Sequence, residues 1–189
     1  MILGMDIGGS AVKFGMVTES GEIVSRHEAP VDYDGYRTPI LTTILRETEA
    51  FLRSDGHTVE GIGVSATGQV DDRTGEIIGS NGSIPGYDGT PFKAALEDAF
   101  HIPVWVLNDA NAAVLGEAFT GAAKGYQDVL MITLGTGVGG GVISGGHLLS
   151  GRRGIAGELG HFPIDRNGTM CTCGCRGCYE RYASTSAML

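Results

Sequence analysis

Proline and basic residues are scarce in this sequence, and long apolar runs are missing. The 189 residues include 6 prolines, and the 32 glycines follow no Gly-X-Y period, which excludes a collagen and disfavours Pro/Gly-rich disorder. Lys plus Arg number 13 against 22 Asp plus Glu, a net charge of −9 that argues against a nucleic-acid partner. No apolar run approaches the roughly 20 residues that cross a bilayer, so no membrane partner is expected. The first residues lack the features of a secretory signal, which predicts a cytoplasmic protein.

Apolar residues and glycine are plentiful. The hydrophobic fraction of 42% and the charged fraction of 19% are those of a globular chain. Hydrophobic patterning and turn residues predict strands over 2–5, 11–17, 22–30, 59–65, 103–107, 129–134 and 141–143, and helices over 36–53, 90–100 and 108–119, with a last helix from near Cys178. The order βββαβαβα up to residue 119 predicts an α/β domain, and the new hairpin beyond it predicts a second domain.

Two glycine turns at strand ends each carry a hydroxyl residue. The first holds Asp6, Gly8, Gly9 and Ser10, and the second holds Gly135, Thr136 and Gly137. Backbone N–H groups of such turns can bind a phosphate, although ordinary β-hairpins use the same residues. The letters G-x-G-x-x-G from Gly135 to Gly140 are weak evidence for a dinucleotide fold because a strand follows them, and no P-loop motif occurs. A carboxylate at Asp6 would repel phosphate unless a cation such as Mg²⁺ lay between them.

Polar residues crowd the start of the helix predicted over 108–119. Asn108, Asp109 and Asn111 lie directly after a strand, where ligands bind in α/β proteins. A helix N-cap explains one such residue but not three in four positions. Asp109 could therefore accept a proton from an attacking hydroxyl, as a positioned Asp does in phosphoryl transfer.

All four cysteines lie within eight residues, at Cys171, Cys173, Cys175 and Cys178, and His161 precedes them. Disulfides in so short a span would close strained loops, so the cluster predicts a metal site. His161, Cys171, Cys173 and Cys178 suit a closed, structural zinc site with Cys175 left as a non-ligand. An iron–sulfur cluster on the four thiolates is less attractive because it would leave His161 unused.

Five segments together resemble the ROK family of repressors and sugar kinases. The segments are Asp6-Ile-Gly-Gly-Ser10, Asn108-Asp-Ala-Asn-Ala-Ala113, Leu134-Gly-Thr-Gly-Val-Gly-Gly-Gly141, Gly157-Glu-Leu-Gly-His161 and Cys171-Thr-Cys-Gly-Cys-Arg-Gly-Cys-Tyr-Glu180. The resemblance implies an actin-like, ribonuclease-H-like ATPase fold, with two domains around a cleft. It also implies ATP and Mg²⁺ at the two glycine turns and Asp109 as the base that activates a hexose hydroxyl, usually the 6-hydroxyl. The residues implied to contact the sugar are Asn81, Asn108, Glu158, His161 and Glu180.

The resemblance covers the whole chain but not the whole family fold. It implies domains at 1–118 and 119–189, with the second domain incomplete, because family members continue beyond the position of Leu189. The expected function is ATP-dependent phosphorylation of a hexose, glucokinase-like, by a homodimer. Two alternatives stay open, a sugar-sensing transcriptional regulator and a sugar-binding fragment without turnover.

Overall fold

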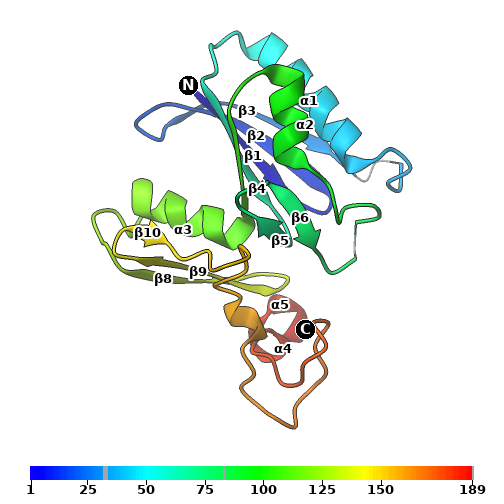
Figure 1. The fold of residues 1–189 in the computed structure, drawn as a ribbon, viewed down its shortest axis with the longest axis vertical. Coiled ribbons are helices and arrows are strands. Elements are labelled where there is room, and N and C mark those ends of the chain that lie inside the picture. Colours follow the sequence, from blue (N-terminus) through cyan, green and yellow to red (C-terminus); the bar gives the residue numbers. More distant parts are fainter. Residues whose placement is uncertain (32–33, 83, 189) are drawn as a thin grey trace. The chain divides into compact units, whose positions relative to one another are not determined.

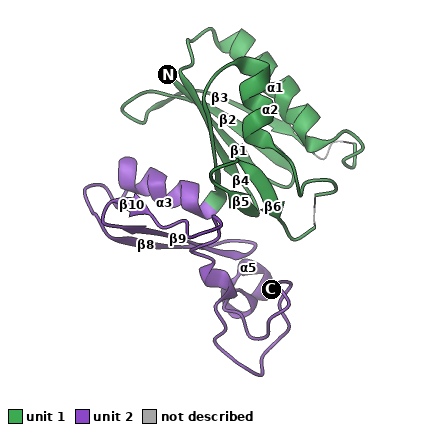
Figure 2. Cartoon of the chain, viewed as in Figure 1, with its two compact units in different colours: residues 1–109 green, residues 110–189 purple. Residues whose placement is uncertain are grey.

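The computed structural model describes residues 1–31, 34–82 and 84–188. The chain forms two compact units, an N-terminal unit of Met1–Asp109 and a C-terminal unit of Ala110–Leu189 (Figure 2). The domain boundary expected after residue 118 stays a prediction. Among the described residues, no helix is both long enough and apolar enough to span a membrane.

The N-terminal unit is built on a five-stranded sheet in the order β3-β2-β1-β4-β7 (Figure 1). Its strands are β1 (Ile2–Ile7), β2 (Ala11–Val17), β3 (Ile23–Pro30), β4 (Gly61–Ala66) and β7 (Val104–Asn108). The first three strands form the predicted antiparallel meander, whereas β1, β4 and β7 run parallel. In register, Ile7 pairs with Ala66 and Ala66 pairs with Asn108. The carboxyl ends of the three parallel strands therefore meet at one edge of the sheet, where α/β proteins bind ligands.

Helices α1 (Ile40–Asp55) and α2 (Phe92–Phe100) bury their apolar faces against this sheet. Each helix begins later than predicted, because Pro39 and Pro91 occupy the N-cap positions, where the fixed φ angle of proline suits the chain just before a helix. Gly56 ends α1 with a φ of 77°, in the left-handed region that glycine adopts without steric cost.

The sequence interpretation missed a short hairpin between β4 and α2, formed by β5 (Gln69–Asp71) and β6 (Glu76–Gly79). The two strands are three and four residues long, and only Val70 and Ile77 are buried in them. One buried residue in each of two such short strands is too little for a recognisable alternation.

The C-terminal unit contains α3 (Asp109–Phe119) from Ala110 onward and a three-stranded sheet in the order β10-β9-β8. Its strands are β8 (Val129–Leu134), as predicted, β9 (Val138–Ser144) and β10 (His147–Leu148). Short helices follow, namely the 3-10 helix η1 (Leu159–His161), α4 (Glu180–Ala183) and α5 (Thr185–Met188).

Strand β9 begins at Val138 rather than at residue 141, so the second glycine turn is shorter than expected. Gly139 and Gly141 belong to the strand and lie against α3. A Cβ on Gly141 would lie 2.6 Å from Cγ1 of Val114, and a Cβ on Gly139 would lie 3.0 Å from Cβ of Ala110. Here glycine permits close packing of helix and strand, which the sequence pattern did not separate from its use in a turn.

Candidate functional site

The first glycine turn joins β1 to β2. The N–H of Gly8 donates to the carbonyl oxygen of Ala11 (3.0 Å), and the carbonyl oxygen of Ser10 accepts from the N–H of Val31 (2.9 Å). Within the described part of the chain, the N–H groups of Gly9 and Ser10 donate to no protein acceptor, and both residues are exposed. Successive free N–H groups at the end of a strand can hold an anion such as a phosphate.

Asp6 lies on β1 just before this turn, with its carboxylate exposed. Its Oδ1 accepts a hydrogen bond from the hydroxyl of Ser65 on the neighbouring strand β4 (2.9 Å). On the other side, Lys13 of β2 is its register partner. Sequence reasoning missed Ser65, because nothing in the sequence pairs two residues 59 positions apart.

Asn108 and Asp109 stand at the carboxyl end of β7, as predicted. Asp109 is the exposed first residue of α3, and the side-chain amide of Asn108 donates to the carbonyl oxygen of Gly68 (2.8 Å). The adjacent carbonyl oxygen, of Thr67, accepts from the hydroxyl of Tyr87 (3.1 Å). The turn after β4 thus connects Asn108 to the loop between β6 and α2, where the exposed Asn81 lies.

Tyr87 is a buried residue of this site that sequence reasoning missed. Burial raises the pKa of Tyr87, and the negative charges of Asp109 and then Asp6 raise it further. The structure brings Asp6, Asp109 and Asn108 together at one edge of the N-terminal unit.

The second glycine turn joins β8 to β9. As in the first turn, the N–H of its first glycine donates to a carbonyl oxygen within the turn. The N–H of Gly135 donates to the carbonyl oxygen of Gly137 (2.9 Å). The carbonyl oxygen of Gly135 accepts from Oγ1 of Thr185 (2.7 Å), and that of Thr136 accepts from Oγ of Ser186 (2.9 Å). In a trans peptide the carbonyl and the next N–H point in opposite directions. The N–H groups of Thr136 and Gly137 therefore point away from Thr185 and Ser186, and among the described residues they find no protein acceptor.

Glu180, the first residue of α4, contacts this second turn. Its Oε2 accepts from the N–H of Val138 (3.0 Å), and a Cβ on Gly137 would lie 2.5 Å from the same oxygen. Glu180 was predicted as a sugar ligand, and the structure adds a role in fixing the end of the turn. That contact joins residues 42 positions apart, so the sequence does not reveal it.

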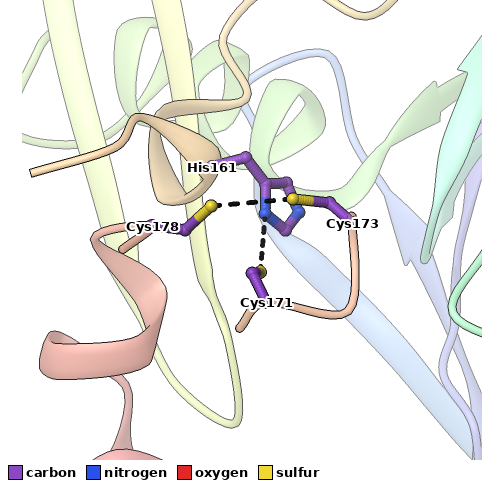
Figure 3. Close-up of side chains that lie close together, drawn as sticks. All are labelled: His161, Cys171, Cys173 and Cys178. Atoms are coloured by element: carbon purple, nitrogen blue, oxygen red, sulfur yellow. Dashed lines mark hydrogen bonds between the residues drawn. The ribbon is translucent and has the colours of Figure 1, made fainter. Parts of the chain in front are cut away.

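Four side chains converge in the loop that precedes α4, and they are the predicted His161, Cys171, Cys173 and Cys178 (Figure 3). Their ligand atoms all lie within 4.8 Å of one another. Nδ1 of His161 is 3.5 Å from Sγ of Cys171, and the sulfurs of Cys173 and Cys178 are 3.6 Å apart. Tetrahedral zinc with bonds of about 2.3 Å to sulfur has sulfur–sulfur edges of about 3.8 Å. The four residues therefore fit a zinc ion.

The electrostatics of the thiols also suit a cation. Burial raises the pKa of Cys178 to about 12, so this thiol needs a bound cation to become a thiolate at neutral pH. The backbone N–H of Cys175, by contrast, lowers the pKa of Cys173. N–H groups that point at a sulfur favour its charged form.

The loop that carries the four cysteines, residues 171–178 (the cysteine loop), is connected to the rest of the C-terminal unit through η1 and α4. The N–H of Tyr179 donates to the carbonyl oxygen of Phe162 (2.9 Å), and the N–H of His161 donates to that of Glu158 (3.1 Å). Glu158 and His161 are three residues apart on a 3-10 turn, where such positions lie above one another. Gly160 packs on the backbone of Val138 so closely that a Cβ would overlap its carbonyl oxygen. The loop thus places Glu158 and Glu180 next to the start of β9.

Comparison with known proteins decides the family. The model of the ROK family matches residues 2–189. The chain belongs to the ROK family. The glucokinase of Thermotoga maritima is 37% identical over 99% of this chain and 58% of its own length. The xylose repressor of Bacillus spizizenii is 32% identical over 99% of the chain and 48% of its own length. The chain thus spans about three-fifths of the length of the glucokinase.

Solved ROK structures confirm the fold class. A ROK glucokinase from Streptomyces griseus, in complex with glucose and AMPPNP, matches 99% of this chain and 58% of its own at 39% identity and a TM-score of 0.82. A ROK hexokinase from Thermus thermophilus matches 99% of this chain and 61% of its own at 36% identity and a TM-score of 0.85. The mixed α/β architecture is that of the actin-like ATPase fold, as predicted.

Proposed function

We propose that this chain is part of an ATP-dependent hexose kinase of the glucokinase type. The observation that carries the proposal is the position of Asp109, an exposed carboxylate at the carboxyl end of β7 that shares its sheet edge with Asp6. Glucokinases 37–39% identical to the chain over nearly its full length support it. The second domain would begin at residue 119, and the chain matches 58% of the length of the Thermotoga maritima glucokinase.

The two glycine turns would hold ATP. Each presents two successive N–H groups that donate to no acceptor in the described protein, Gly9 and Ser10 in one and Thr136 and Gly137 in the other. Such groups stabilise negative charge on phosphate oxygens. Mg²⁺ near Asp6 would neutralise charge on the phosphates, and the hydroxyl of Ser65 would hold the Asp6 carboxylate in place.

Asp109 would act as the general base. Its carboxylate would accept the proton of a hexose hydroxyl, the 6-hydroxyl by resemblance, while that oxygen forms a bond to the terminal phosphorus of ATP and ADP leaves. Its place at the first turn of α3 favours the charged form, because the helix dipole stabilises a carboxylate there. The buried Tyr87 donates to the carbonyl oxygen of Thr67 and stays neutral.

Asn81, Asn108, Glu158, His161 and Glu180 would bind the sugar. A zinc ion on His161, Cys171, Cys173 and Cys178 would be structural, since four protein ligands leave no open position. Nδ1 of His161 faces Cys171, so Nε2 is the atom that would reach a sugar hydroxyl. Cys178 lies two residues before Glu180, so the metal would fix α4 and with it Glu180. The homodimer and the cytoplasmic location stay predictions.

Asp109→Asn tests the proposal in the longest reading frame that contains this sequence. We expect hexose-dependent ADP release to fall by about 10²–10⁴-fold, the usual contribution of a general base. Zinc content and glucose binding by calorimetry should stay unchanged. Asp98→Asn, on the exposed face of α2, is the matched control and should keep full activity. Full turnover in the Asp109 variant would refute the assignment, and sugar binding without turnover in the wild type would favour a regulator or an inactive fragment.

A further inference from the structure

The cysteine loop carries one thiol more than the proposed zinc site uses. Cys171 and Cys178 are buried, whereas Cys173 and Cys175 are exposed. Cys173 is thus the one proposed sulfur ligand that solvent reaches, and Cys175, which is not among the four converging residues, is exposed beside it. An oxidant in solution would meet these two sulfurs first.

The backbone of the loop holds Cys173 and Cys175 on either side of one glycine. The N–H of Cys171 donates to the carbonyl oxygen of Cys175 (2.8 Å), and the N–H of Gly174 donates to that of Cys171 (3.0 Å). Gly174 has a φ of 88°, which turns the chain sharply between the two cysteines. Residues two apart around such a turn can reach the Cα separation of about 4.4–6.8 Å that a disulfide needs. The small loop that this disulfide closes is strained, and the strain makes the bond easy to reduce again.

We propose that Cys173 and Cys175 form a peroxide-sensitive pair, in which oxidation to a disulfide releases the structural metal. This inference rests on the proposed zinc site, because it requires Cys173 to be a ligand. Cys175 is then the resolving thiol of the loop and not a spare residue.

The chemistry balances with hydrogen peroxide as the oxidant. The thiolate of Cys173 attacks one peroxide oxygen, the O–O bond breaks, and Cys173 becomes a sulfenic acid with release of hydroxide. The sulfur of Cys175 then attacks the sulfenic sulfur, the S–O bond breaks, and its thiol proton leaves with the oxygen as water. The two sulfurs lose two electrons in total, which reduce the peroxide. Only His161, Cys171 and Cys178 would then remain to hold a zinc ion, so the affinity of the site for zinc would fall.

Loss of the metal would also affect the second glycine turn, because Glu180 links the cysteine loop to that turn. Cys178 is followed directly by Tyr179 and Glu180, and Glu180 accepts from the N–H of Val138 at the end of that turn. A loop without its metal no longer fixes the start of α4. Peroxide would therefore loosen a contact that the turn needs for its shape, and a thiol reductant with zinc would restore it.

Zinc release and disulfide mapping test the proposal on the purified chain. Metal content is measured first, and hydrogen peroxide is then added in excess. We expect the wild type to release its zinc as a Cys173–Cys175 disulfide appears in peptide mass spectra, and to bind zinc again after reduction with dithiothreitol. Cys175→Ser should start with the same zinc content. Without a resolving thiol, its Cys173 should gain two oxygens as a sulfinic acid, which dithiothreitol does not reduce, so zinc rebinding should be lost.

The control variant is Thr172→Ser, in the same exposed loop, which should behave as the wild type does. A wild-type disulfide that joins Cys173 to Cys171 or Cys178 would overturn the proposal. So would full zinc rebinding by Cys175→Ser. Absence of zinc from the fresh wild-type protein would overturn the metal assignment itself, and the initial metal measurement separates that failure from the others.

Discussion

Replacing Gly141 by alanine should destabilise the C-terminal unit by about 1–3 kcal/mol, the usual cost of overpacking a core. The added Cβ would lie 2.6 Å from Cγ1 of Val114 and 2.9 Å from the carbonyl oxygen of Ala110. Non-bonded carbon atoms prefer about 3.5–4.0 Å. Helix α3 would therefore have to move away from β9 by about 1 Å, which would weaken the packing along that face.

Gly116→Ala is the matched control, because Gly116 lies on α3 and a Cβ there meets no atom within 4 Å. Alanine in an exposed helix position should stabilise the chain by about 0.5–1 kcal/mol, since it has less conformational entropy to lose than glycine. Both variants add one methyl group, on α3 or on the neighbouring β9, and we expect them to change the free energy of unfolding in opposite directions.

Urea unfolding followed by circular dichroism measures both variants, and hydrogen exchange of the peptide that covers β9 assigns the change to this unit. The reasoning predicts a lower midpoint and faster exchange in β9 for Gly141→Ala. A Gly141→Ala protein as stable as the wild type would refute the packing role of the strand glycines. The glycine-rich run would then need an explanation in ligand binding.

Three further perturbations follow from contacts within the two units. Tyr87→Phe removes the hydrogen bond to the carbonyl oxygen of Thr67 and should lower the free energy of unfolding by about 1 kcal/mol, measured by urea titration. If the proposed zinc is bound, its removal with a chelator should speed hydrogen exchange in the peptide that contains Glu180 but leave α1 protected. Equal protection before and after chelation would contradict the proposed coupling. Asp128, just before β8, accepts a hydrogen bond from the N–H of Gly145, which holds the pKa of Asp128 below its ordinary value of 3.8. The ionised carboxylate therefore stabilises the folded chain at neutral pH, and this stabilisation is lost as the pH falls through the lowered pKa. The stability difference between the wild type and Asp128→Asn should accordingly shrink on acidification, and a difference that is the same at neutral and at strongly acidic pH would show that this carboxylate does not matter.

Much of the fold could be predicted because the local patterns were strong. Strands β2 and β8 have the predicted bounds, since alternating or continuous apolar residues end at clear turn residues. The predicted starts of α1 and α2 were too early, because each helix begins only after a proline, Pro39 or Pro91, at the N-cap position. The β5–β6 hairpin was missed because its strands are short and each buries one apolar residue. The start of β9 was missed because its glycines also suit a turn.

The candidate site divides in the same way. The converging His161, Cys171, Cys173 and Cys178 were predicted as a group, because three of the four lie within eight residues and their chemistry permits few alternatives. Ser65 and Tyr87 were not predicted, since each acts on a residue or backbone group far along the chain. The spacing of residues along the sequence identifies a cluster that lies within one loop. Contacts between residues of separate strands become visible only when the fold is known.

Direct detection of the product tests the central claim. The longest reading frame that contains this sequence is incubated with ATP and glucose, and the products are analysed by mass spectrometry and by phosphorus NMR. The account predicts one hexose 6-phosphate for each ADP formed, with both products absent when Asp109 is replaced by asparagine. ADP without sugar phosphate, or bound glucose that is never phosphorylated, would contradict it.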